Sequence, residues 1–354
     1  MASVDIPTSE RFNFCSSVRD DVWHGDKLAK AYEWWYFDAL SDDGSEAVVV
    51  VFLDNFVYSP RYNSKDGSQP KRFPAVAFTY FNGGKAIYRS VSEFGEAGFS
   101  ADTERPKGRI GECSFEYRDA TYGSGYVVNV RMALSGGRRL EGTFEWLSVE
   151  ADMLPDSFCT DSTMHSWNMV APRSDVTGRL TIYDRRGRES DLRHFRGTGY
   201  HDHNLDNRWL AKTVRDWHWG RAHFADATAV FYRYCEVDEQ SPSTKLFVIR
   251  DQELKERIVD YDEQNYARDR HGIRYPTRLR LISEDNVRLR VKPLTVIDSS
   301  FYFLRFLADF TLTLRDGVPR RTTGITEFIA PSSLKYKWLN WLSDLRVKKS
   351  EVER

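Results

Sequence analysis

Apolar and polar residues alternate along many short segments of this chain, and tight-turn residues separate those segments. In the segment 128–146, two alternating runs flank the Ser-Gly-Gly turn at 135–137. A period of two is typical of a strand with one face in a core, and a glycine-rich turn between two such runs predicts a hairpin. Paired runs at 75–88 and 279–291 predict two further hairpins. The chain is therefore expected to be an all-β protein of antiparallel strands.

The second half of the chain repeats this pattern, with strands predicted at 180–182, 229–234, 246–249 and 310–314. Many short strands joined by tight turns favour β-barrels or sandwiches over βαβ units. A chain of 354 residues is long enough for two domains. We predict an N-terminal β-domain over 1–172 and a C-terminal β-barrel over 173–354, with the boundary at the turn residues from Pro172 to Gly178.

Only the C-terminus is predicted to be helical. Ser332 or Ser333 can cap a segment whose apolar residues recur at helical spacing. One face of this short helix would carry Leu334, Trp338, Trp341, Leu342 and Leu345. Its expected role is a structural brace or lid.

Charge and composition exclude several classes of function. The formal net charge is −1 and both signs are interspersed, which argues against a nucleic-acid partner. No glycine-rich phosphate loop follows a strand and opens a helix. No apolar run is long enough to span a bilayer, and the N-terminus lacks the pattern of an export signal. We therefore expect a soluble cytoplasmic protein, and the sequence leaves peripheral membrane contact and the oligomeric state open.

The four cysteines are widely scattered along the chain and include no CxxC pair. They are predicted to be free thiols in a reducing compartment. The cysteines concerned are Cys15, Cys113, Cys159 and Cys235.

Reactive side chains are densest between Gly197 and Asn204. On a strand, Tyr200 and Asp202 would point to one face, whereas His201 and His203 would point to the other. One face thus offers acid chemistry. The other could bind a metal through His201 and His203, with Asp206, His218 or His223 completing the ligands, although the His-x-His spacing alone is a weak signal. Alternatively, these polar groups only satisfy one another at a turn.

Three other segments combine aromatic and ionisable residues. In the first, two acids flank four aromatics, and a strand would place Glu33, Trp35 and Phe37 on one face and Trp34, Tyr36 and Asp38 on the other. The second contains His165 and Trp167, where a lone histidine is more often structural than catalytic. In the third, Trp217, Trp219, Arg221 and His223 would share one face of a strand, either as a binding wall or as core packing.

These segments together resemble the carotenoid 1,2-hydratase (hydroxyneurosporene synthase) family. That family belongs to a lipocalin-like (AttH-like) superfamily that includes fungal Diels–Alderases and is related to tocopherol cyclase. The matching motifs run along nearly the whole chain, and their order and spacing make the resemblance specific. They are Glu33 to Asp38 with Ser41 to Gly44, Phe56 to Pro60, His165 to Trp167 with Ala171-Pro172, Gly199 to Asp202, Trp217 to Arg221 and Gly324 to Phe328.

The resemblance implies two tandem lipocalin-like β-barrels with an apolar pocket near their junction and with no metal or organic cofactor. It also implies a catalytic His-x-Trp pair, matched here by His165 and Trp167, and a Tyr-x-Asp pair, matched by Tyr200 and Asp202. One departure concerns the substrate, because many relatives have Trp-Gly where this chain has Leu205-Asp206.

The expected activity is that of a cofactor-independent hydratase or cyclase (a lyase or isomerase) that protonates an alkene of a hydrophobic polyene or isoprenoid. Asp202, kept neutral in an apolar pocket, would be the acid. The alternatives are a Diels–Alderase-like cyclase of natural products and a non-catalytic carrier of lipid or pigment. Side chains expected to contact the substrate are those of Glu33, Trp35, His201, Trp217, Trp219 and Arg221.

Overall fold

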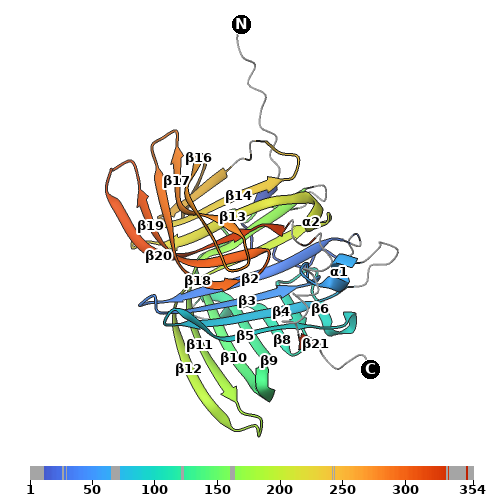
Figure 1. Cartoon of the computed structure of the whole chain (residues 1–354). Coiled ribbons are helices and arrows are strands. Elements are labelled where there is room, and N and C mark those ends of the chain that lie inside the picture. The colour runs from blue at the N-terminus through green and yellow to red at the C-terminus, as the bar shows by residue number, and fades with distance from the viewer. Residues whose placement is uncertain are drawn as a thin grey trace.

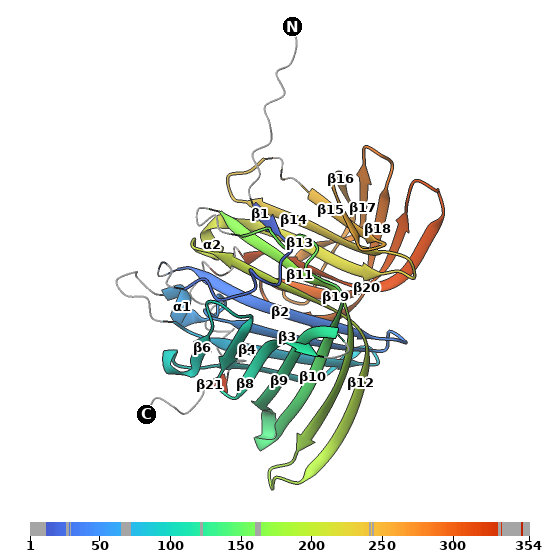
Figure 2. The same cartoon turned by 180° about the vertical axis from the view of Figure 1, so that it is seen from behind.

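The computed structural model describes residues 12–25, 28, 30–64, 72–120, 123–159, 164–240, 242, 244–331, 334 and 348–349. Its strands form an open, curled sheet and a closed barrel that lie against each other (Figures 1 and 2). The predicted all-β fold class is confirmed, although the first sheet is open and only the second closes into a barrel.

The open sheet has the strand order β21-β5-β4-β3-β2-β12-β11-β10-β9-β8-β7-β6, and β1 pairs with β11. Its strands are β1 (Phe12–Cys15), β2 (Tyr32–Ser41), β3 (Glu46–Leu53), β4 (Ala75–Asn82), β5 (Lys85–Glu93), β6 (Phe99–Ala101), β7 (Lys107–Ile110), β8 (Cys113–Ala120), β9 (Gly123–Ala133), β10 (Arg139–Glu150), β11 (His165–Tyr183), β12 (Glu189–Asp206) and β21 (Lys348–Lys349). The described residues also include the short helical turns α1 (Pro60–Ser64), η1 (Glu96–Gly98), η2 (Ser135–Gly137) and α2 (Leu210–Thr213).

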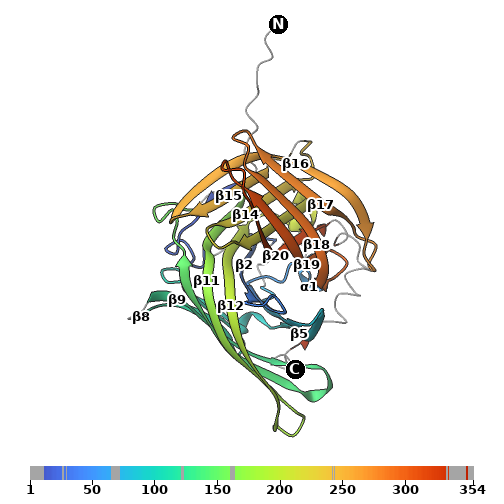
Figure 3. The ribbon, with the colours of Figure 1, turned by 90° about the vertical axis from the view of Figure 1, so that its left-hand side faces the viewer.

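The barrel, whose strands β14 to β20 are labelled in Figure 3, is a meander in which each strand pairs antiparallel with the next. It closes where β20 pairs with β13. Its strands are β13 (Val214–His223), β14 (Thr228–Glu236), β15 (Thr244–Arg250), β16 (Glu253–Arg268), β17 (Arg274–Ser283), β18 (Arg288–Ser299), β19 (Phe303–Thr313) and β20 (Pro319–Ile329). The three predicted hairpins are confirmed as β4–β5, β9–β10 and β17–β18.

The sheet gives way to the barrel later in the chain than the predicted boundary at 172/173. That boundary lies inside β11, and the open sheet continues to the end of β12 at Asp206. The register between β11 and β12 shifts on either side of Ala171, so the strand passes through Pro172 as an irregular stretch. Bulges of this kind accommodate proline within a sheet. The segment from 207 to 213, which includes α2, leads into the barrel.

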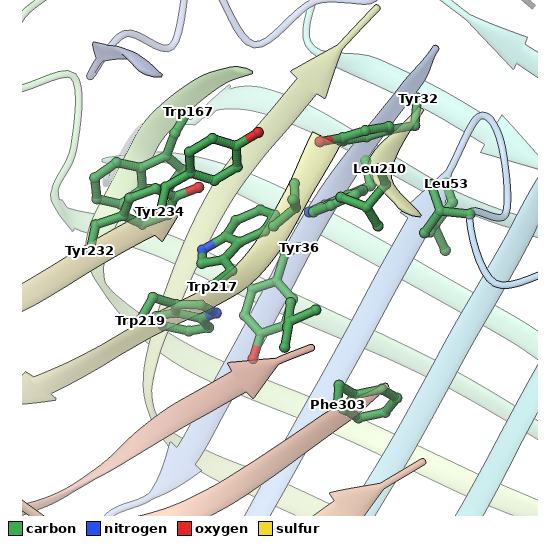
Figure 4. Packing of buried hydrophobic residues seen from close by; sticks show 14 of the residues in the cluster. Tyr32, Tyr36, Leu53, Trp167, Leu210, Trp217, Trp219, Tyr232, Tyr234 and Phe303 are labelled. Atoms are coloured by element: carbon green, nitrogen blue, oxygen red, sulfur yellow. The ribbon is translucent and has the colours of Figure 1, made fainter. Parts of the chain in front are cut away.

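Alternation along the strands creates separate cores on the two faces of β2. Trp35 and Phe37 pack inside the curled sheet, whereas Trp34 and Tyr36 face the barrel. This confirms the predicted division of faces in this segment. On the barrel side, Trp217 and Trp219 of β13 meet the open sheet, as Figure 4 shows. The largest aromatic cluster therefore lies between the two sheets.

Two further predictions concern a C-terminal helix and membrane-spanning segments. The predicted C-terminal helix lies outside the described residues, apart from Leu334. Within the described ranges, no helix combines the length and apolar character needed to cross a membrane.

The prediction of four free thiols is wrong for two of them. Cys15 and Cys159 form a disulfide across a sequence separation of 144 residues, whereas Cys113 and Cys235 are free and buried. Pairing of β1 with the start of β11 brings the two ends of this long segment together. A pairing at such separation leaves no local spacing pattern.

This disulfide is expected to stabilise the fold, because it closes a long loop in the unfolded chain. Replacing Cys15 with serine should lower the free energy of unfolding by about 2–4 kcal/mol. Urea denaturation with and without reductant measures the effect. Reductant should destabilise the wild type and leave Cys15→Ser unchanged; equal curves for the wild type in both conditions would refute the role of the disulfide.

Candidate active site

Asp202 is the centre of the site. It lies on β12 opposite Tyr36 of β2, and its side chain is only 3% exposed. Its Oδ2 accepts hydrogen bonds from Trp167 Nε1 at 3.0 Å and from Tyr200 Oη at 2.8 Å. Its Oδ1 accepts one from Asn204 Nδ2 at 2.9 Å. Three of the four predicted catalytic residues, Asp202, Trp167 and Tyr200, are thus in direct contact.

The backbone explains how these side chains converge. Tyr200, Asp202 and Asn204 alternate along β12 and share one face. Trp167 lies on the neighbouring strand β11, where it pairs with Asn204 of β12. The register between the two strands shifts at the next positions, opposite Asp202. Bulges often redirect side chains next to active sites.

Burial controls the protonation of Asp202. Removal from water raises the pKa of Asp202 to about 7, and the negative charges of Asp38 and Glu327 act in the same direction. The hydrogen bonds from Trp167 and Tyr200 oppose this shift. A carboxyl group with this pKa is available both as acid and as conjugate base near neutral pH.

His165 connects to Asp202 through two intervening side chains. Its Nε2 lies 2.6 Å from Tyr232 Oη, which donates to Asn204 Oδ1 at 3.3 Å, and Asn204 in turn donates to Asp202. Its Nδ1 lies 3.3 Å from Tyr32 Oη. Burial holds the pKa of His165 well below its usual value, so the imidazole is neutral.

A cavity lies beside Asp202, between the open sheet and the outer face of the barrel. It contains about 860 Å³ of space not filled by atoms, counting the part open to solvent. Asp202 and Asn204 form part of its wall. Its apolar and aromatic lining consists of Trp34, Tyr36, Val49, Val51, Leu53, Phe56, Tyr58, Ala77, Val91, Trp217, Trp219, Tyr302, Phe303 and Ile329.

The aromatic wall is continuous with the residues that hold Asp202. Trp219 stacks on Tyr200 with ring centroids 5.2 Å apart and meets Tyr36 edge-on at 5.3 Å. Trp34 stacks on Trp217 at 5.5 Å. Figure 4 shows Trp217, Trp219 and Tyr36 grouped between the strands of the two sheets. Trp217 and Trp219, two of the predicted substrate contacts, therefore line the cavity.

The other four predicted substrate contacts do not line this cavity. Glu33 and Trp35 are on the opposite face of β2, and His201 is on the opposite face of β12, because alternate residues of a strand face opposite ways. Arg221 is buried and pairs with Asp38, with a bond from Nε to Oδ1 of 2.9 Å. The alternation of side chains along a strand therefore excludes Glu33, Trp35 and His201 from the cavity. Arg221 is excluded by its pairing with Asp38, which lies far away in the sequence.

The histidines on the opposite face of β12 from Asp202 form a separate cluster with Asp21 and Glu33. His203 Nδ1 lies 3.1 Å from Asp21 Oδ1 and its Nε2 lies 2.7 Å from Glu33 Oε1. His201 lies 3.0 Å from Asp21 Oδ2 through Nε2 and 2.9 Å from the Tyr36 carbonyl oxygen through Nδ1. Both nitrogens of each ring thus lie beside oxygen atoms, and these contacts hold the two rings on the face of β12 opposite Asp202.

The predicted alternative of a metal held by His201 and His203 is not the arrangement in the structure. Among the described residues, the histidine group whose ligand atoms converge is His24, Glu33 and His203, and His201 is not part of it. His24 Nδ1 lies 2.8 Å from Glu33 Oε1. His203 thus lies between two carboxylates, those of Asp21 and Glu33.

The family model for carotenoid hydratase CrtC matches residues 49–352 of the chain. The chain belongs to the carotenoid hydratase CrtC family. It is 24% identical to a hydroxyneurosporene dehydrogenase of Chlorobaculum tepidum, over 95% of this chain and 92% of that protein. It is 25% identical to an acyclic carotenoid 1,2-hydratase of Rubrivivax gelatinosus, over 57% of this chain but only 47% of that protein.

A solved structure shares the fold of this family member. The crystal structure of CghA with Sch210972 matches with a TM-score of 0.58 and 14% sequence identity, and the match covers 85% of this chain and 89% of CghA. Membership of the carotenoid hydratase family supports an enzyme of the hydratase, or lyase, type.

Sequence reasoning missed several residues of the site. Asn204 is the last residue of the reactive segment between Gly197 and Asn204. Because it is two residues from Asp202 on the same strand, it could have been predicted to share a face with Asp202 and bond to it. Glu327 lies within a segment that carries the family resemblance, but nothing local linked it to the cavity. Tyr232 lies on a strand with an ordinary apolar pattern, so no signal indicated that it would bond to His165.

Proposed function

We propose that this protein adds water to an alkene of a hydrophobic polyene or isoprenoid, with Asp202 as the acid and with no cofactor. The observation that carries the proposal is a buried carboxyl group, with its pKa at about 7, in the wall of an aromatic cavity. A neutral carboxyl in an apolar site can transfer a proton to a weakly basic carbon. Family membership supports the same class of reaction.

The hydrogen bonds leave a place for the acidic proton. Oδ2 of Asp202 accepts from two donors and Oδ1 from one, so Oδ1 keeps a free position. The O–H bond at Oδ1 breaks as the proton joins one alkene carbon, and the positive charge develops on the other. The carboxylate formed remains stabilised by Trp167, Tyr200 and Asn204.

Aromatic faces stabilise the carbocation without capturing it. Trp34, Trp217 and Trp219 line the cavity, and each desolvated aromatic face contributes about 2 kcal/mol to a nearby cation. Water then adds to the cation and loses a proton to the Asp202 carboxylate, which restores the acid. The product is an alcohol with the mass of the alkene plus one water.

We assign His165 a positioning role. As a neutral imidazole it donates from Nε2 to Tyr232, which orients Asn204 against Asp202. The chain of hydrogen bonds thereby holds Asp202 Oδ1 toward the cavity.

Incubation with acyclic polyenes in ¹⁸O-labelled water, followed by mass spectrometry, tests the proposal. Hydration gives a product that has gained one labelled water. An isomer of unchanged mass and new retention would mean that an internal group captures the cation, which is cyclisation. Recovery of every substrate unchanged, with binding intact, would refute catalysis and favour a carrier.

Turnover is expected to fall as the pH rises through about 7, because the acid form of Asp202 is lost above its pKa. Trp167→Phe removes a hydrogen bond that lowers this pKa, so the fall should move to higher pH. The pH profile of kcat measures both effects. A profile that stays flat to pH 9 in the wild type would contradict the assignment of Asp202 as the acid.

A further inference from the structure

A row of four charged side chains crosses the wall of the same cavity. Asp298, Arg305 and Glu327 are register neighbours on β18, β19 and β20, and Arg89 reaches them from β5 of the open sheet. All four line the cavity. None of them belongs to the aromatic wall or transfers the proton in the reaction proposed above, although the negative charge of Glu327 helps to raise the pKa of Asp202.

The contacts within the row are ion pairs. Arg305 bonds to Glu327 Oε2 through both Nε and Nη2, each at 2.8 Å. Arg89 Nη2 lies 3.0 Å from Asp298 Oδ1. Because both bonds from Arg305 end on Oε2, Oε1 of Glu327 is left to accept another hydrogen bond.

Charged side chains in the wall of a cavity that binds only hydrocarbon cost desolvation free energy. Glu327 and Arg305 are 5% and 6% exposed, so both have lost most of their hydration. Apolar side chains of similar size would hold a pure hydrocarbon at least as well. Charged groups facing a ligand become favourable when the ligand supplies polar atoms that replace the lost water.

The charge balance of the row indicates which polar group fits. Two guanidinium groups and two carboxylates give no net charge, so an anionic ligand group finds repulsion as well as attraction. A hydroxyl oxygen can donate to Glu327 Oε1 and accept from a guanidinium, and a carbonyl can accept. A neutral oxygen function therefore matches the row best.

The row also lies near the reacting group. Glu327 pairs across β20 and β13 with Trp219, whose ring stacks on Tyr200 beside Asp202. Tyr58, stacked on Tyr302 at 3.8 Å, adds aromatic surface to the same cavity. One ligand can therefore contact both Asp202 and the row.

We propose that Arg305, Glu327, Arg89 and Asp298 form a subsite for a hydroxyl or carbonyl oxygen, so that the preferred substrate is an oxygenated isoprenoid and not a pure hydrocarbon. This inference rests on the proposed function, because it names the substrate class of the same cavity.

The test compares an acyclic polyene hydrocarbon with its monohydroxylated derivative that keeps the same reacting alkene. Binding is measured by quenching of tryptophan fluorescence in the Asp202→Asn variant, so that no turnover intervenes. The hydroxylated compound is expected to bind at least about tenfold more tightly. In the triple variant that adds Arg305→Gln and Glu327→Gln, this ratio should fall toward one through weaker binding of the hydroxylated compound alone.

A matched control replaces the exposed pair formed by Arg320 and Asp226 on the same barrel, as Arg320→Gln with Asp226→Asn. It should leave the ratio unchanged. Equal affinities for the two compounds before the row is altered would overturn the inference, and that measurement needs no variant of the row. A preference that survives loss of Arg305 and Glu327 would overturn it as well. If the preference holds but neither compound gains water with the wild type, the proposed function fails and the subsite stands.

Discussion

Replacing Asp202 with asparagine is expected to lower kcat by about 10²–10⁴-fold, the range typical of loss of a positioned general acid. Asparagine keeps the shape of the side chain and can accept a hydrogen bond, but it has no acidic proton to transfer. Turnover of an acyclic polyene, followed by the formation of hydrated product, measures the loss. The fold should be retained, because no buried charge loses its partner.

The effect on stability has a definite sign. Burial raises the folded-state pKa of Asp202 to about 7, above its unfolded value, so the stability gained from protonation is fully present at low pH. It is lost as the pH rises through about 7. Asp202→Asn should therefore melt at a temperature that depends less on pH between 4 and 8 than the wild-type value does.

Asp175→Asn is the matched control, because Asp175 is an exposed residue of the adjacent strand β11. Its activity and melting curve should equal those of the wild type. If Asp202→Asn kept more than about a tenth of the wild-type activity, proton transfer from this carboxyl would not limit the reaction. A pericyclic reaction directed by the shape of the cavity would then be the better explanation.

Local alternation was enough to predict many of the elements and their facing. The hairpins at β4–β5, β9–β10 and β17–β18 follow from a period of two interrupted by turn residues. The same period correctly divided Tyr200 and Asp202 from His201 and His203. Strand facing depends only on neighbours in the sequence, which is why it could be predicted.

The partners across the sheets could not be predicted in this way. Strand register depends on contacts between distant segments, so neither the bond from Tyr232 to Asn204 nor the disulfide from Cys15 to Cys159 leaves a local pattern. The predicted boundary at 172/173 falls inside β11 for a related reason. Turn-forming residues such as Pro172 end most strands, but a bulge carries β11 past this one.

Arg221 was predicted to contact the substrate, but it pairs instead with a buried carboxylate. It shares a strand face with Trp217 and Trp219, yet its guanidinium bonds to Asp38 of β2 through Nε and Nη2. The two residues are 1% and 0% exposed. This ion pair joins the barrel to the open sheet, and Asp38 also accepts a hydrogen bond from Tyr36 at 3.1 Å.

Arg221→Met is therefore expected to lower the free energy of unfolding by about 3–5 kcal/mol, because it leaves Asp38 as a buried carboxylate without its cation. Asp38→Leu combined with Arg221→Met removes both charges and should recover a large part of this loss, since replacing a whole buried pair by apolar residues is often neutral.

Urea denaturation of the wild type, both single variants and the double variant gives the coupling energy between the two residues. The substitution Arg320→Met, at an exposed ion pair of the barrel, is the control and should cost less than about 1 kcal/mol. If Arg221→Met cost no more than this control, the pair would not be what fastens the barrel to the sheet. The position of Asp202 between them would then depend on the aromatic cluster and on the other contacts that cross from sheet to barrel, such as those of Tyr232 with His165 and Asn204.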